Sequence, residues 1–177
     1  MLYYLALGSN MGDRLSNIRR ATAFLKTIGT VLKASSIYET LPVAMAPDAE
    51  NFYNQVLCLD SHLSPHDLLK AAKEFEKKMG RDVTSPTASH NKPRTMDIDI
   101  LLAGDRVIAT RELTIPHKEM HNREFVLAPL NEIAPAAIHP VLKQRITEIL
   151  SRLKTPEQIN GRQKNATTLK TIREGVF

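Results

Sequence analysis

The stretch that best indicates the fold is residues 92–102, Lys-Pro-Arg-Thr-Met-Asp-Ile-Asp-Ile-Leu-Leu. From Thr95 onward its apolar and polar residues alternate, which predicts a β-strand whose successive side chains point to opposite faces. One face of this strand is expected to carry Met96, Ile98, Ile100 and Leu102, and the other face Asp97, Asp99 and Leu101. Two carboxylates therefore share one face.

Neighbouring side chains on one face of a strand lie roughly 7 Å apart, so the two unpaired anions would repel each other and raise each other's pKa. This indicates a cation between Asp97 and Asp99. Magnesium fits, because it takes oxygen ligands and commonly binds through one or two carboxylates together with phosphate oxygens. The alternative is a solvated strand face on which each acid pairs with a lysine or arginine, and the motif alone leaves both interpretations open.

The composition favours one soluble domain. A chain of 177 residues with 42% hydrophobic residues can bury one sizeable core. The 24 Lys and Arg exceed the 19 Asp and Glu, and the resulting net charge of +5 suits an anionic ligand. The single cysteine, Cys58, cannot form an internal disulfide, and no apolar run is long enough to span a membrane. We therefore expect a cytoplasmic protein that does not cross a membrane.

Capping residues mark two helices. Asp13 can cap a helix that Gly29 ends, and Ser64-Pro65 begins a second helix that ends at Gly80. Strands are expected before, between and after them, at residues 2–7, 31–40, 52–60 and 95–102. This order predicts an α+β fold, a ferredoxin-like antiparallel sheet with helices packed on one or both faces.

The turn Gly8-Ser9-Asn10 after the first strand is ambiguous, since a glycine turn before a helix can bind phosphate. No Lys-Ser or Lys-Thr pair follows Gly8 and Gly12, so a structural turn is favoured.

Two polar loops, residues 41–50 and 81–92, are expected to flank the site that carries the two carboxylates.

The C-terminal half contains weaker signals. Gly104-Asp105 predicts a β-hairpin that returns through residues 106–109. Asn122 is expected to cap a helix that ends near Pro135, and residues 146–153 form a last amphipathic helix. We assign residues 1–153 to a catalytic domain and residues 154–177 to a polar tail, weakly ordered or docked at the surface.

Basic residues lie at loops or element ends around the acidic strand, and they are Arg81, Arg94, His117 and Arg123. Arg94 immediately precedes the strand, and its planar guanidinium suits phosphate oxygens. Metal on one side and arginines on the other would neutralise a polyphosphate along its length. For His117, an ordinary loop histidine and a functional residue are equally open interpretations.

Three motifs together resemble one family. They are Gly8-Ser9-Asn10, then Pro93-Arg94-x-x-Asp97-Ile98-Asp99-Ile100-Leu101, then Pro116-His117 followed by Arg123-x-Phe125-x-Leu127-x-Pro129-Leu130. In this order, from about Leu2 to about Leu153, the chain resembles the 6-hydroxymethyl-7,8-dihydropterin pyrophosphokinases of folate biosynthesis. It departs from the family pattern at Asn91 and Lys92, where an aromatic residue and a glycine are usual.

The resemblance implies transfer of pyrophosphate from ATP to 6-hydroxymethyl-7,8-dihydropterin with release of AMP, by a monomer. The implied catalytic set is Arg81, Arg94, Asp97 and Asp99, with two magnesium ions held by the two aspartates. The implied ATP-binding residues are Glu76, Arg94, His117 and Arg123. The implied pterin-binding residues are Thr40, Pro42, Val43, Phe52, Asn54 and Phe125, with the pterin ring stacked between the two phenylalanines.

Two other functions fit the pattern less well. A nucleic-acid-binding sheet is disfavoured by the 5% aromatic content and by two acids on a sheet face, which would repel phosphate without metal. A different metal-dependent nucleotidyl or phosphoryl transferase also uses paired aspartates. The product of ATP separates these reactions, since AMP indicates pyrophosphoryl transfer, ADP phosphoryl transfer, and free pyrophosphate nucleotidyl transfer.

Overall fold

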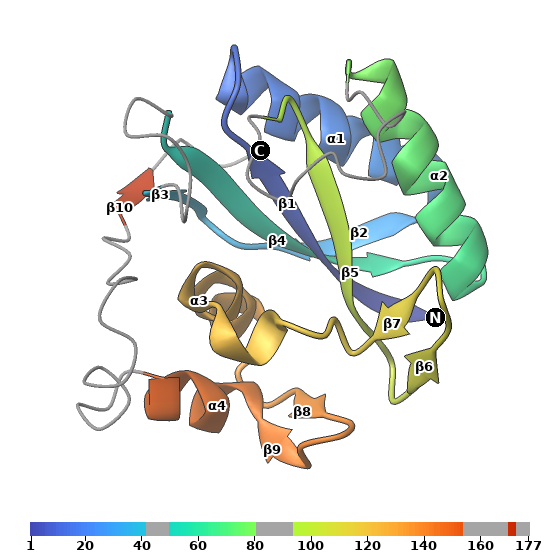
Figure 1. The fold of residues 1–177 in the computed structure, drawn as a ribbon, viewed down its shortest axis with the longest axis vertical. Helices are drawn as coiled ribbons and strands as arrows, with labels where there is room; N and C mark the ends of the chain where they lie inside the picture. Colours follow the sequence, from blue (N-terminus) through green and yellow to red (C-terminus); the bar gives the residue numbers. More distant parts are fainter. Residues whose placement is uncertain (42–49, 81–93, 154–169, 173–177) are drawn as a thin grey trace.

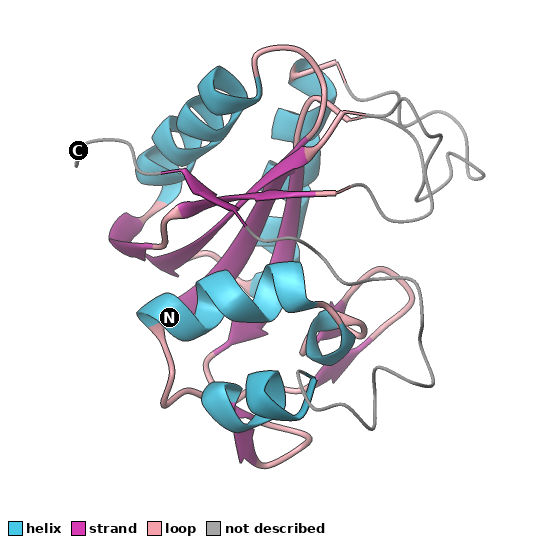
Figure 2. Cartoon of the chain, turned by 90° about the vertical axis from the view of Figure 1, so that its left-hand side faces the viewer, coloured by secondary structure: helices cyan, strands magenta, loops and turns pink. Residues whose placement is uncertain are grey.

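An antiparallel sheet lies between two layers of helices in the computed structural model, which describes residues 1–41, 50–80, 94–153 and 170–172 (Figures 1 and 2). The central sheet contains β1 (Leu2–Ser9), β2 (Thr30–Ala34), β3 (Ile37–Thr40), β4 (Phe52–Asp60), β5 (Asp97–Ala103) and β10 (Lys170–Ile172). Its order is β10-β3-β4-β1-β5, with β2 also paired to β4. This is the predicted ferredoxin-like arrangement, and the expected α+β fold class is confirmed.

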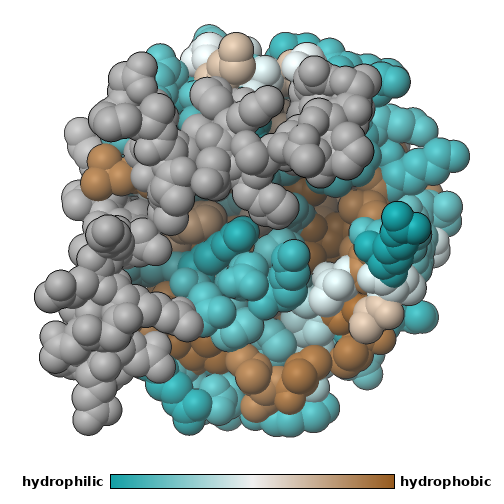
Figure 3. All heavy atoms as spheres, in the orientation of Figure 1, coloured by the Kyte–Doolittle hydropathy of each residue, from teal (hydrophilic) through white to brown (hydrophobic). Residues whose placement is uncertain are grey.

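Helices α1 (Arg14–Ile28) and α2 (Pro65–Lys78) cover one face of this sheet, above it in Figure 1. The other elements lie below the sheet or at its lower edge, and they are β6 (Ile108–Ala109), β7 (Thr114–Ile115), a 3-10 turn (Met120–Asn122), α3 (Glu124–Ile133), β8 (Ile138–His139), β9 (Gln144–Arg145) and α4 (Ile146–Leu153). No described helix is long and apolar enough to cross a membrane. Figure 3 shows hydrophobic side chains along the lower edge, over α4 and the β8–β9 hairpin, where Ile138 and Val141 are exposed.

The two helices on the first face begin as their capping residues predict. The Asp13 side chain accepts a hydrogen bond from Ser16 N at 2.9 Å at the start of α1. Ser64 caps α2, where its Oγ accepts from Asp67 N at 3.2 Å. Both caps satisfy backbone N–H groups that have no partner within the helix.

The sheet divides the core into two clusters. Leu5, Leu7, Leu57 and Ile98 belong to the cluster under α1 and α2. The second cluster lies under α3 and α4, and includes Val56, Cys58, Leu101, Leu127 and Leu130. Alternation along β4 therefore directs its side chains to opposite clusters, as the period of two predicts.

The prediction that Leu102 shares a face of the strand with Met96, Ile98 and Ile100 is wrong. Leu5 pairs with Ile100 whereas Tyr4 pairs with Leu102, so β5 contains one extra residue at this point. This β-bulge turns Leu101 and Leu102 to the same side, and both pack in the second cluster. The bulge comes after Asp99, so the acidic end of the strand keeps its alternation.

The strand expected over residues 31–40 is divided into β2 and β3. Ser35 lies at the division, where its N donates to Val56 O at 2.9 Å and its Oγ accepts from Val56 N at 3.0 Å. A side-chain oxygen thus replaces a backbone acceptor in the ladder, which interrupts the strand.

The prediction that residues 106–109 return after Gly104 to form a hairpin with the carboxylate strand is also wrong. Instead, β6 pairs with β7 in a separate two-stranded sheet, and among the described strands β5 pairs only with β1. Asn122 belongs to the 3-10 turn, and Arg123 occupies the N-cap position of α3 without a side-chain hydrogen bond.

Candidate active site

Asp97 and Asp99 begin β5 on the side of the sheet that faces α3. Ile98 between them is 1% exposed in the first core cluster, so the two carboxylates point to the opposite face, as the alternation predicts. The Asp97 side chain is 15% exposed and the Asp99 side chain 35% exposed. Both carboxylates are therefore accessible to a ligand.

Asp97 lies between two basic side chains. Arg94 forms an ion pair with Asp97 Oδ2. Lys73, from the middle of α2, places its Nζ 3.8 Å from Asp97 Oδ1. The sequence pointed to Arg94 but not to Lys73, because the contact between α2 and β5 joins residues that are 24 positions apart in the chain.

Glu76 has a completely buried carboxylate, with 0% exposure. Its Oε1 accepts a hydrogen bond from Ile98 N at 2.9 Å, and Lys73 Nζ donates to both oxygens at 2.8 and 3.0 Å. Among the described strands β5 lies at the edge of the sheet, so Glu76 satisfies a backbone N–H that no described strand pairs with. Glu76 thereby fixes α2 against the acidic strand.

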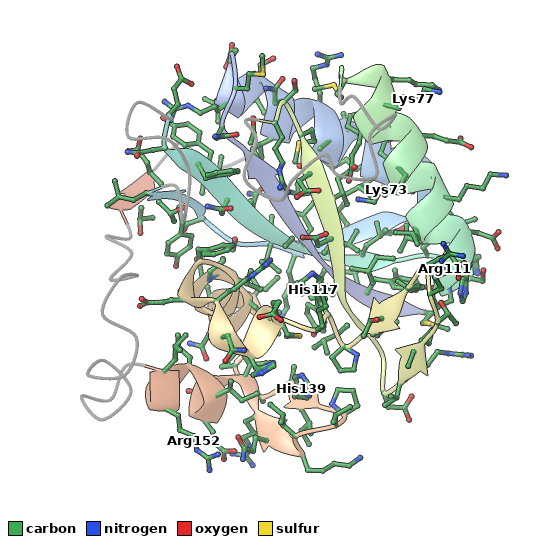
Figure 4. All side chains as sticks on the ribbon, in the orientation of Figure 1. Lys73, Lys77, Arg111, His117, His139 and Arg152 are labelled. Atoms are coloured by element: carbon green, nitrogen blue, oxygen red, sulfur yellow. The ribbon has the colours of Figure 1, made fainter. Side chains whose placement is uncertain are left out.

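His117 covers the same edge of β5 further along. Its backbone N donates to Leu101 O at 3.0 Å, and its Nδ1 accepts from Glu119 N at 3.2 Å. The other ring nitrogen, Nε2, lies 3.9 Å from Asp99 Oδ2, and Figure 4 shows the residue close to β5. His117 and Asp99 are thus directed toward each other.

The environment changes the pKa of both groups. Burial among protein atoms raises the pKa of Asp99, and the negative charge of Asp97 raises it further, against the opposing effect of His117, Lys73 and Arg123. Burial lowers the pKa of His117, and the carboxylate of Asp99 opposes this change. Such shifts are typical of functional sites.

Arg123 and Phe125 come from the start of α3. The Arg123 guanidinium carbon lies 5.8 Å from the centre of the Phe125 ring, and its charge acts on Asp99. Phe125 is half-buried at the border of the second cluster. The start of α3 therefore brings a cation and an aromatic ring to the face that carries the two aspartates.

Asn54 and Thr40 form a buried polar pair on the same face. Asn54 Nδ2 donates to Thr40 Oγ1 at 2.8 Å, and the residues are 8% and 2% exposed. Phe52 is two residues before Asn54 on β4 and shares its face. The sequence-predicted residues Pro42, Val43 and Arg81 lie outside the described residues.

Gly8 lies directly between Asn54 and Asp97. It pairs with Asn54 on one side and with Asp97 on the other, so the three residues form a row across β4, β1 and β5. Two strand spacings separate the ends of this row by about 10 Å. Gly8 belongs to β1 itself, which corrects the expectation that it forms a turn after the strand. Gly8 has no side chain, and the atoms nearest to where its Cβ would lie are Asn54 Oδ1 at 3.4 Å and Phe52 Cδ1 at 3.9 Å.

Asn10 joins the segments on both sides of this row. Its N donates to Arg94 O at 3.1 Å and its Oδ1 accepts from Arg94 N at 2.8 Å. Its Nδ2 donates to Glu50 O at 3.4 Å. Asn10 is 2% exposed. This buried amide therefore holds Arg94, which precedes β5, and Glu50, which precedes β4, in fixed positions relative to each other.

The donor set agrees with magnesium. No group of three His, Cys, Asp or Glu side chains suited to a metal is present within the described ranges. Magnesium usually takes only one or two carboxylates and completes its shell with water and substrate phosphates, so Asp97 and Asp99 are a sufficient protein contribution.

The chain is similar to known proteins in both sequence and fold. A family model described as 7,8-dihydro-6-hydroxymethylpterin-pyrophosphokinase matches residues 4–135. The chain is 39% identical over 145 residues to the 2-amino-4-hydroxy-6-hydroxymethyldihydropteridine pyrophosphokinase of Aquifex aeolicus, covering 82% of this chain and 88% of that protein. The protein of the same name from Bacillus subtilis is 43% identical over 132 residues, covering 73% of this chain and 76% of its own.

Longer proteins contain a similar segment. The folic acid synthesis protein FOL1 of Dictyostelium discoideum is 41% identical over 141 residues, which are 80% of this chain but 21% of that protein. The chain thus spans about a fifth of the length of this relative. A crystal structure of Plasmodium falciparum HPPK-DHPS has a similar fold, with a TM-score of 0.72, 16% identity and coverage of 96% of this chain and 48% of the other.

Proposed function

The chain belongs to the 7,8-dihydro-6-hydroxymethylpterin-pyrophosphokinase family, and we propose on this premise that it transfers the pyrophosphoryl group of ATP to 6-hydroxymethyl-7,8-dihydropterin. The hydroxymethyl oxygen bonds to the β-phosphorus of ATP. The bond from that phosphorus to the oxygen bridging the α-phosphate breaks, AMP leaves with this oxygen, and the hydroxyl proton passes to solvent. The products are the pterin diphosphate and AMP, as in folate biosynthesis.

The observation that carries this proposal is the row of Asn54, Gly8 and Asp97 across three adjacent strands. This row has an amide at one end, a residue without a side chain in the middle and a carboxylate at the other end. A flat heterocycle resting on Gly8 would meet the Asn54 amide, with its reactive substituent on the side of the aspartates. Phe52 lies on β4 two residues before Asn54, and Phe125 lies near the start of α3, and stacking on such rings adds about 0.5–1.5 kcal/mol beyond area burial.

The charges around β5 support a polyphosphate site that needs metal. The carboxylates of Glu76, Asp97 and Asp99 are balanced by the cations of Lys73, Arg94 and Arg123 among the described residues. A triphosphate would add several negative charges to this balanced set. Asp97 and Asp99 would hold magnesium, with two ions expected, and bound magnesium neutralises phosphate oxygens and polarises the phosphorus that is attacked.

The protein's own side chains would act by positioning and by charge. Arg94 precedes the two aspartates in the sequence and Arg123 follows them. Both offer planar donor groups to phosphate oxygens. Because His117 Nδ1 accepts a hydrogen bond from Glu119 N, the neutral ring carries its proton on Nε2, which is directed toward Asp99 and offers one more donor. No covalent intermediate with the enzyme is required, since positioning alone can supply about 7–11 kcal/mol of the barrier.

The residues proposed to contact substrates all fall in residues 1–153, which we assign as the catalytic domain. β10, in the polar segment 154–177, adds an edge strand beside β3. We also infer a monomer located in the cytoplasm, and light scattering of the purified chain tests the oligomeric state.

The decisive experiment is to incubate the protein with ATP, magnesium and 6-hydroxymethyl-7,8-dihydropterin and to separate the nucleotides. We expect AMP that depends on the pterin, and its loss in Asp97→Asn, which keeps the shape of the side chain but removes one negative charge. Circular dichroism and thermal unfolding of both proteins serve as controls for folding. Formation of ADP, or of free pyrophosphate, by the folded protein would replace this reaction by another transferase activity.

A further inference from the structure

Lys73 connects two carboxylates that belong to different parts of the fold. Its Nζ lies 2.8 Å from Glu76 Oε1 on the same helix and 3.8 Å from Asp97 Oδ1 on β5. Figure 4 shows Lys73 between α2 and β5, whereas Lys77, one turn later, points away from the sheet. The Lys73 side chain remains 40% exposed, so its ammonium is at the border of the site and solvent.

The position of Glu76 explains why a cation is needed there. A fully buried carboxylate is costly unless a charge and hydrogen bonds compensate it. Ile98 N supplies one hydrogen bond, and Lys73 supplies the positive charge. The ammonium is therefore held in place by Glu76, whether or not a ligand is bound at Asp97.

The same ammonium competes for Asp97. With Arg94 at Oδ2 and Lys73 near Oδ1, each oxygen of this carboxylate faces a protein cation. A divalent cation that binds Asp97 must share the carboxylate with these two charges, and like charges at such separations repel each other. A polyphosphate that arrives with the metal removes this repulsion, because its oxygens also neutralise Lys73.

We propose that Lys73 is a positioning residue that keeps the Asp97–Asp99 pair weak for divalent cations until a polyphosphate is present, so that metal and nucleotide bind together. This rests on the proposed function only in naming ATP as the source of the polyphosphate. Metal binding to the protein without nucleotide, and its change on removing the Lys73 charge, are independent of any reaction.

The test measures Mn²⁺ affinity by electron paramagnetic resonance in the absence of nucleotide. Mn²⁺ takes the same carboxylate and water ligands as magnesium. Lys73→Gln removes the charge and keeps a hydrogen-bond donor for Glu76. We expect it to bind Mn²⁺ about tenfold more tightly than the wild type, because an ammonium held 3.8 Å from a carboxylate oxygen of Asp97 would repel a cation bound to that carboxylate. A purely structural lysine would give weaker binding or no change.

Matched variants isolate the charge. Lys73→Arg keeps the positive charge and should bind Mn²⁺ as weakly as the wild type, while Lys77→Gln removes an exposed charge from the same helix and should have little effect. In the presence of α,β-methylene-ATP, the difference between Lys73→Gln and the wild type should become smaller. Unchanged or weaker Mn²⁺ binding by folded Lys73→Gln overturns the proposal, as does equal tightening in Lys77→Gln.

A double variant covers the case in which Lys73→Gln folds poorly. Lys73→Gln combined with Glu76→Gln removes one positive and one negative charge and leaves no buried carboxylate without a cation. Its Mn²⁺ affinity should return to within about threefold of the wild-type value, since the two charge changes oppose each other. If the double variant binds Mn²⁺ much more weakly than the wild type, Lys73 does not oppose the metal and the proposal is wrong.

Discussion

Replacing Gly8 by alanine should weaken binding of the pterin without lowering the stability of the protein. A Cβ at this position would lie 3.4 Å from Asn54 Oδ1 and 3.9 Å from Phe52 Cδ1, which are ordinary contact distances. Gly8 is in a strand, where glycine is about 0.5–1 kcal/mol less favourable than alanine. The variant should therefore be at least as stable as the wild type.

The same methyl group would cover the backbone of Gly8, which lies between Asn54 and Asp97. A flat ring on this surface would have to move away from the Asn54 amide, and misplaced packing of this size costs about 1–3 kcal/mol. This corresponds to a loss of roughly fivefold to 150-fold in pterin affinity. Urea unfolding measures the stability, and calorimetry with the pterin and α,β-methylene-ATP measures the affinity.

Gly29 provides a matched control for this substitution. Its Cβ would lie 2.5 Å from the backbone oxygen of Asp60, so Gly29→Ala forces α1 and β4 apart and should cost about 1–3 kcal/mol of stability. Pterin affinity of the folded protein should be unaffected. A stable Gly8→Ala variant that binds the pterin as tightly as the wild type would refute the role of the Asn54, Gly8 and Asp97 row.

Two other residues give predictions of different kinds. Burial, and then the charge of His121, lowers the pKa of His139, so the stability that this residue contributes is full above its ordinary pKa of about 6.5 and is lost as the pH falls below it. His139→Asn keeps a side-chain acceptor near the position of Nδ1 but cannot titrate, so urea unfolding at about pH 7.5 and about pH 5.5 should show a smaller decrease than in the wild type, and an equal decrease would contradict this cause. Asn10→Ala should raise the KM for ATP and for the pterin together, because Arg94 and Glu50 lose their shared partner, and steady-state kinetics in which only one KM changes would argue against this joint role.

Local signals in the sequence predicted most of the sheet and the helices. The caps at Asp13 and Ser64 and the stops at Gly29 and Gly80 define α1 and α2, because a helix begins and ends through contacts within one turn. The alternation around Asp97 placed the two aspartates on one face, because successive side chains of a strand point to opposite faces. The motifs also indicated the family correctly, since the family model covers them.

Pairing between distant segments could not be predicted in this way. The bulge that turns Leu102, the partner strand of β6 and the row through Gly8 all depend on which strands lie side by side. Lys73 is the clearest case, because no residue near it in the sequence indicates Asp97 as its partner, and only the packing of α2 against β5 brings the two side chains together. Periodicity and capping are properties of neighbouring residues and are determined by the sequence itself, whereas register and ion pairing across the sheet were decided by the tertiary structure, since they arise from contacts that the whole core must satisfy together.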